Sequence, residues 1–149
     1  METIWITENK KDYLSLLLLG DEQEEMIDRY LGHGEMFVLE DDGKGLAVIV
    51  VTDEGSGVLE IKNLAVDPSV QKLGYGRRMI DDVEKRYRST HHTLLVGTGD
   101  SPMTIPFYER CGFTRSHTVR DFFIHHYDHP IIEGGVQLRD MVYLKKAIE

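Results

Sequence analysis

The stretch from Asn63 to Arg78 reads NLAVDPSVQKLGYGRR and joins a strand, a glycine-containing loop and a helix. The β-branched and aliphatic residues of Leu59–Val66 are typical of a strand, which the turn residues Asp67-Pro68 end. After the loop Gln71–Gly76, apolar residues recur at the spacing of an amphipathic helix, at Met79, Ile80, Val83 and Tyr87. This order directs several free backbone N–H groups and the positive end of a helix at one place, which suits a pyrophosphate or another compact anion.

The loop pattern Q-x-x-G-x-G is a weak signal when it stands alone. Any tight glycine turn before a helix matches it, so a plain turn and an anion-binding loop both stay open. Two other nucleotide motifs are excluded. The dinucleotide fingerprint needs a third small residue where Met79 stands, and the phosphate-binding loop of nucleotide triphosphatases needs a Gly-Lys-Ser/Thr triplet that the chain lacks.

Composition predicts one globular domain that spans residues 1–149, because 41% hydrophobic and 29% charged residues is an ordinary balance for a chain of this length. The 17 basic and 26 acidic residues give a net charge of −9, which disfavours non-specific nucleic-acid binding and favours cationic small molecules. The apolar run Leu16–Leu19 is too short for a signal peptide or a membrane span. We therefore expect a soluble cytoplasmic protein with no nucleic-acid or membrane partner.

Hydrophobic patterning predicts the remaining elements. Strands are expected at residues 2–7, 35–40, 45–52, 93–96, 113–124 and 138–145. Helices are expected at residues 11–19, in the segment that Asp21 caps, at 77–88, and around 107–111, where Pro106 either kinks the helix or leaves its start near Thr104. We expect the strands before the loop to form an antiparallel meander. The strand–helix–strand crossover makes Leu59–Val66 and Thr93–Val96 a parallel pair.

Three motifs in fixed order resemble the GNAT superfamily of acetyl-CoA-dependent N-acetyltransferases. They are Asn63-Leu64-Ala65-Val66, Gln71-x-x-Gly74-x-Gly76 and Phe107-Tyr108-Glu109-Arg110-Cys111-Gly112-Phe113, and the match runs from Glu35 to Phe113. The resemblance implies a mixed α/β GNAT-like fold, in which an antiparallel meander and a splayed parallel strand pair are flanked by helices. It also implies acetyl-CoA as the acetyl donor, with no metal.

The same resemblance implies where acetyl-CoA binds. Its pantetheine arm would pair with backbone groups of Leu64, Ala65 and Val66, and one backbone N–H near Leu64 or Ala65 would bind the thioester oxygen. Its pyrophosphate would lie on the N–H groups of Gln71, Lys72, Leu73, Gly74, Tyr75, Gly76 and Arg77. Ser101 stands where the family commonly has an asparagine, so a side-chain contact to the cofactor there differs from the family pattern.

Two residues are candidates for catalysis. Tyr108 resembles the general acid of the family, and the alternative is a core tyrosine at a helix end. A phenol near pKa ~10 protonating a thiolate near ~8.5 is uphill by ~2 kcal/mol, which favours Tyr108 as a hydrogen-bond donor to the sulfur. Glu60 stands where the histone-type branch of the family has its general base, and the alternative is an exposed strand glutamate paired with Lys62 or solvent.

The cysteine and the clustered histidines are weaker candidates for a nucleophile and for metal ligands. Cys111 lies in the last apolar turn of the expected helix, which favours a buried small hydrophobe over a nucleophile. As the only cysteine, it also excludes an internal disulfide. His125 and His126 fall in the expected strand at 113–124 or just beyond it, where adjacent side chains point to opposite faces, and with His129 they do not form a metal site.

We therefore expect an acyltransferase that moves an acetyl group from acetyl-CoA to an amine by direct attack in a ternary complex. The long connection Tyr127–Gln137 is expected to wall the acceptor site. A non-catalytic acetyl-CoA sensor on the same fold, and an interaction protein without a cofactor, are the alternatives. The acceptor amine stays open, as does the choice between a monomer and a homodimer.

Overall fold

The computed structural model describes residues 1–149 and contains nine strands and five α-helices. The strands are β1 (Glu2–Ile6), β2 (Glu35–Asp41), β3 (Lys44–Gly55), β4 (Val58–Val66), β5 (Thr93–Gly99), β6 (Thr114–Val119), β7 (Ile132–Glu133), β8 (Val136–Gln137) and β9 (Met141–Ala147). The helices are α1 (Leu14–Gly20), α2 (Glu24–Leu31), α3 (Tyr75–Tyr87), α4 (Ile105–Arg110) and α5 (Phe122–His126), with 3-10 turns at Lys10–Tyr13 and Pro68–Val70.

Seven strands form one sheet in the order β1-β2-β3-β4-β5-β9-β6, and β7 and β8 form a separate small hairpin. Every neighbouring pair is antiparallel except β4 and β5, which are parallel. The meander and the parallel pair expected from the sequence are therefore confirmed. Helix α3 supplies the crossover between the two parallel strands.

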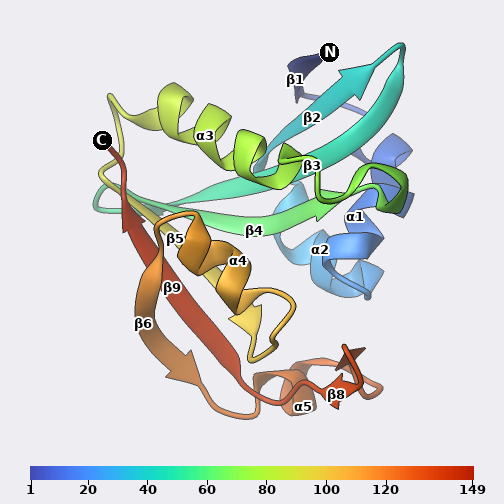
Figure 1. Ribbon diagram of the computed structural model, residues 1–149, viewed down its shortest axis with the longest axis vertical. Coiled ribbons are helices and arrows are strands. Elements are labelled where there is room, and N and C mark those ends of the chain that lie inside the picture. The colour runs from blue at the N-terminus through green and yellow to red at the C-terminus, as the bar shows by residue number, and fades with distance from the viewer.

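The parallel strands separate after a short paired stretch. Val58–Ile61 pairs with Thr93–Val96, and beyond these residues β4 continues to Val66 and β5 to Gly99 without pairing to each other. In Figure 1, β4 runs to one side while β5, β9 and β6 run downward from the same end of the sheet. The splayed pair is thus a property of the fold, and it leaves one edge of each strand open.

A bulge in β4 changes which side chains face which layer. Val51 pairs with Ile61 and Val50 pairs with Asn63, so Lys62 is the extra residue. An inserted residue reverses the alternation of a strand. Leu64 consequently joins Ile61 on the α3–α4 face, whereas Asn63 lies on the other face with the α1–α2 layer.

The sheet is covered on both faces, which explains its nearly continuous apolar strands. On one face Phe37 and Ile49 pack with α3 and α4 residues in a core of 19 buried side chains. On the other face Val38 and Val48 pack with α1 and α2 in a core of 10 buried side chains. Two buried faces require apolar residues at successive strand positions rather than at alternate ones.

Several predicted boundaries in the first half of the chain are wrong. The helix expected at residues 11–19 begins with a 3-10 turn at Lys10–Tyr13, and α2 is preceded by Gln23 rather than capped by Asp21. Asp21 instead ends α1 in an extended conformation, and its carboxylate accepts hydrogen bonds from two tyrosines. Helix α3 begins at Tyr75, two residues before the expected start, because Gly74 takes the left-handed conformation that precedes its first turn.

The expected strand at 113–124 is also wrong in its second half. Strand β6 ends at Val119, Asp121 adopts φ 54°, and Phe122–His126 forms α5. His125 and His126 are therefore helical neighbours and not strand residues. The closing strand starts at Met141 rather than at 138, because Leu138 packs instead with Phe123 and Ile131 in a small cluster under α5.

Candidate active site

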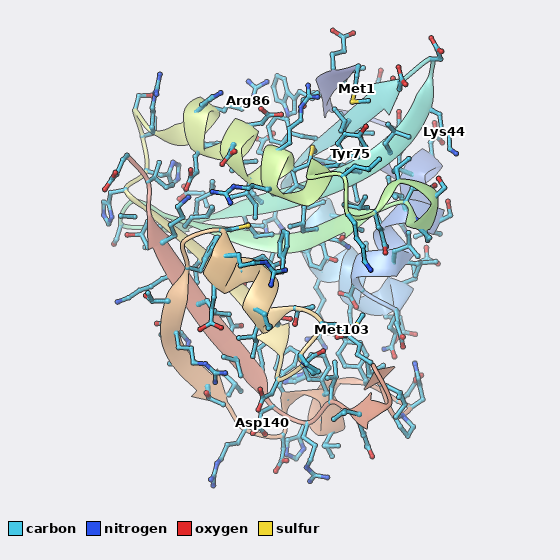
Figure 2. All side chains as sticks on the ribbon, in the orientation of Figure 1. Met1, Lys44, Tyr75, Arg86, Met103 and Asp140 are labelled. Atoms are coloured by element: carbon cyan, nitrogen blue, oxygen red, sulfur yellow. The ribbon has the colours of Figure 1, made fainter.

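The glycine loop at the start of α3 presents unpaired backbone donors. The first backbone hydrogen bond of α3 runs from the Arg78 N–H to the Gly74 carbonyl, at 3.0 Å, so the N–H groups of Tyr75 to Arg77 have no partner within the helix. Lys72 and Gly74 have φ values of 66° and 87°, which turn the preceding backbone toward the helix start. Figure 2 labels Tyr75 at this helix start. The arrangement has the form of an anion site.

The two glycines of the loop are required for different reasons. Gly74 needs its positive φ, whereas a Cβ added there would meet no atom within 4 Å. A Cβ on Gly76 would lie 3.1 Å from Cζ of Phe107, so Gly76 lets α3 approach α4 closely. The Gln71 side chain closes the loop by donating to the Val66 carbonyl at 3.1 Å. Gln71 thus has a role in fixing the loop that its position alone did not reveal.

A cavity of about 200 Å³ lies where β4 and β5 separate. We call it the inner cavity. It is lined by residues 61–64 of β4, residues 96–99 of β5, residues 19–22 after α1, Thr104, Tyr108, and side chains from the segment 123–141. The cavity thus brings together Leu64 and Tyr108, two of the residues that the sequence proposed for the site, and their roles stay predictions.

Tyr108 is both a core residue and a cavity residue. Its side chain is 7% exposed, and its ring makes edge contacts with Phe107 and Phe113 at centroid distances of 5.1 and 5.5 Å. Burial raises the pKa of Tyr108 above its ordinary value, and the neighbouring Cys111 and Glu133 add to the rise. The phenol therefore stays protonated and able to donate a hydrogen bond into the cavity.

Ser101 serves the turn before α4. Its Oγ accepts a hydrogen bond from the Met103 N–H at 3.0 Å, and its side chain is buried. Helix α4 starts at Ile105 with Pro106 in its first turn, where a missing N–H costs nothing. The expected start near Thr104 is thus confirmed, and the contact of Ser101 with a cofactor stays a prediction.

Glu60 lines a neighbouring outer cavity of about 350 Å³ rather than the inner one. It is 7% exposed, and its Oε2 lies 2.9 Å from Nζ of Lys62. The alternative interpretation, an exposed strand glutamate paired with Lys62, is therefore wrong about the exposure of Glu60 and correct about its pairing with Lys62. Burial raises the pKa of Glu60, and the Lys62 ammonium opposes that rise. The two cavities adjoin, because Asp21, Ile61, Lys62, Gly97, Tyr127 and Met141 line both.

A hydrogen-bonded network that the sequence did not predict lies between these cavities. Asp21 accepts from the hydroxyl of Tyr127 at 2.8 Å and from that of Tyr30 at 3.3 Å. The Asn63 amide donates to the Tyr30 hydroxyl at 3.0 Å and to the Leu17 carbonyl at 2.9 Å. A local sequence pattern cannot predict these contacts, because Asp21 and Tyr127 are 106 positions apart.

Other candidate residues lie away from this chemistry. Cys111 is buried in the core, as expected, and burial raises the pKa of its thiol. No group of three His, Cys, Asp or Glu side chains is arranged to hold a metal ion, and no helix is long and apolar enough to cross a membrane.

A mixed sheet with a parted central pair, a cavity at the parting and a donor-rich helix start defines the class of GNAT-type acyltransferases. The family model for the acetyltransferase (GNAT) domain matches residues 32–115, and the chain belongs to this family. The uncharacterized N-acetyltransferase YvbK of Bacillus subtilis is 36% identical over 139 residues, which cover 92% of this chain and 90% of that protein.

Solved structures show the same architecture. A GNAT family acetyltransferase from Elizabethkingia anophelis, with acetyl-CoA bound, has a TM-score of 0.92 at 29% identity and covers 98% of this chain and 97% of its own. A Bacillus subtilis acetyltransferase in complex with CoA has a TM-score of 0.89 at 33% identity and covers 99% of each chain. The GNAT-like fold expected from the sequence is confirmed.

Proposed function

We propose that the protein transfers an acetyl group from acetyl-CoA to a primary amine at the inner cavity. The observation that carries this is the cavity where the edges of β4 and β5 are unpaired, which Tyr108 lines, and the donor-rich loop before α3 supports it. Membership of the GNAT family and the similar structures with acetyl-CoA or CoA bound support the donor.

The donor would be held mainly by the backbone. The free N–H groups from Gln71 to Arg77 suit its pyrophosphate, and the open edge of β4 from Leu64 to Val66 suits the amides of its pantetheine arm. Backbone donors are independent of side-chain identity, so the exposed side chains of Lys72 and Leu73 are not needed for this role.

The chemistry is direct transfer. The amine nitrogen forms a bond to the thioester carbon. The carbon–sulfur bond then breaks, its electron pair stays on sulfur, and CoA leaves as the thiolate. A backbone N–H near Leu64 or Ala65 stabilises the oxyanion. Tyr108 donates a hydrogen bond to the departing sulfur, and the amine proton passes to Glu60 directly or through water, because Glu60 lies in the adjoining cavity.

The test is to mix the protein with acetyl-CoA and a panel of primary amines, and to follow release of the CoA thiol together with the mass of the amine product. Amine-dependent thiol release with an N-acetylated product supports the proposal. Acetyl-CoA binding without turnover of any amine would instead support a sensor.

A further inference from the structure

The inner cavity contains a carboxylate that no cationic side chain neutralises. Asp21 is half-buried, its oxygens accept hydrogen bonds only from hydroxyl and backbone N–H groups, and no lysine or arginine forms an ion pair with it. Burial raises the pKa of Asp21, while these hydrogen bonds oppose the rise. Buried carboxylates in proteins are normally paired with a cation, because an isolated buried charge is costly.

A second carboxylate and an amide oxygen in the same cavity also lack partners. Glu133, on β7, lines the cavity, and its Oε2 is shielded from solvent without a hydrogen-bond donor. Asn63 is 2% exposed, and its Oδ1 receives no hydrogen bond, although its amide nitrogen donates to the Leu17 carbonyl and the Tyr30 hydroxyl. Lys62 is the one lysine or arginine that lines the cavity, and its Nζ lies 2.9 Å from Oε2 of Glu60.

These unpaired acceptors predict a ligand rich in N–H donors and positive charge. The nitrogen that attacks the thioester must be neutral at the moment of attack. Carboxylates that bind a positive charge therefore recognise a second, protonated nitrogen of the acceptor. Aromatic rings of Phe123, Tyr127 and Tyr108 contribute further walls of the cavity, and such rings attract cations.

We propose that the acceptor is a diamine-type compound, a primary amine with a second, protonated nitrogen that Asp21 and Glu133 bind. This rests on the proposed function, because it assigns the acceptor of the same site. Asp21 holds the α1–α2 loop to the segment after α5 through Tyr127, so the recognition site forms only when these two distant segments meet.

The test compares diamines with matched monoamines. Each diamine from 1,3-diaminopropane to 1,6-diaminohexane is paired with the monoamine in which a methyl group replaces one ammonium, and kcat/KM is measured for both. A hydrogen-bonded charge contributes ~1.5–3 kcal/mol, so the wild type should prefer at least one diamine by ~10- to 100-fold. Asp21→Asn and Glu133→Gln should each reduce this preference at least several-fold, and the double variant should bring it close to one.

The control is Glu25→Gln, which removes an exposed carboxylate of α2 that lines neither cavity, and it should keep the wild-type preference. Asp21→Asn should also raise Tm at neutral pH, because the uncompensated charge is removed while an acceptor for Tyr127 is kept. A purely structural Asp21 would give a lower Tm and an unchanged preference.

Equal use of diamines and monoamines by the wild type, or a preference that survives both substitutions, would overturn the inference. Turnover of monoamines in that case leaves the proposed function standing. Failure of the proposed function itself has a separate signature, which is the absence of turnover with every amine, monoamine and diamine alike.

Discussion

Tyr108→Phe is the substitution that best isolates one atom of the candidate site. The ring keeps its contacts with Phe107 and Phe113 at 5.1 and 5.5 Å, and no hydrogen bond to the hydroxyl contributes to the pKa of Tyr108. Tm should therefore change little, whereas Tyr108→Ala, which empties the buried site, should cost ~3–5 kcal/mol. The kinetic effect of Tyr108→Phe then reports on the hydroxyl alone.

The size of the kinetic effect separates two roles of the hydroxyl. Loss of a hydrogen bond to a charged sulfur costs ~1.5–3 kcal/mol, which is ~10- to 100-fold in rate. Loss of a proton donor costs ~10²- to 10⁴-fold. Because burial raises the pKa of Tyr108 and makes its proton harder to give up, a hydrogen-bond donor is expected. Initial rates of CoA release with both acetyl-CoA and the amine saturating give kcat, and acetyl-CoA affinity should stay unchanged.

The control is Tyr87→Phe, which removes a hydroxyl on α3 that lines neither cavity. It should retain wild-type turnover. If Tyr108→Phe also turns over like the wild type, then Tyr108 is only a core residue and the catalytic assignment is wrong.

The remaining predictions concern the loop, the base and the acceptor wall. Gly74→Val should abolish the rise in Tm that acetyl-CoA causes, while Gly55→Val, with a similar φ of 84° and equally open surroundings in the β3–β4 turn, should retain it; a full rise in a folded Gly74→Val protein would refute the loop assignment. Glu60→Gln should lower kcat most at neutral pH and recover partly at higher pH, as bulk solvent deprotonates an amine of pKa ~10.4; a pH–rate profile of normal shape would exclude Glu60 as the base. Replacing residues 132–137 by a short glycine linker should change acceptor KM and leave acetyl-CoA affinity unchanged, and equal damage to both would contradict their role in the acceptor wall.

Local sequence patterns were sufficient for the central part of the fold. The aliphatic run before Asp67, the loop glycines and the amphipathic helix identified the parallel crossover, which the structure contains. These features are readable because each depends on residues that are close in sequence.

The rest depends on tertiary contacts without a local signal. The bulge at Lys62 involves no glycine, yet it separates the face of Glu60 and Asn63 from that of Leu64. Phe122 has high strand propensity, but it lies in α5, where its ring makes an edge contact with the ring of Phe123. Burial against the small cluster under α5 overrides that propensity.

Asp21 illustrates the same limit for function. Its position before Glu24 predicted a helix cap, whereas the fold places it beside Tyr127 in the cavity. The place of Asp21 in the cavity can be recognised only from the folded structure, because its partner Tyr127 lies far away in the sequence.

The central claim is direct acetyl transfer in a ternary complex at the inner cavity. Initial rates measured over a grid of acetyl-CoA and amine concentrations, combined with the mass of the protein during turnover, test it most directly. The account predicts double-reciprocal lines that intersect and a protein that never carries an acetyl group. Parallel lines together with an acetylated protein, for example at Cys111, would contradict it.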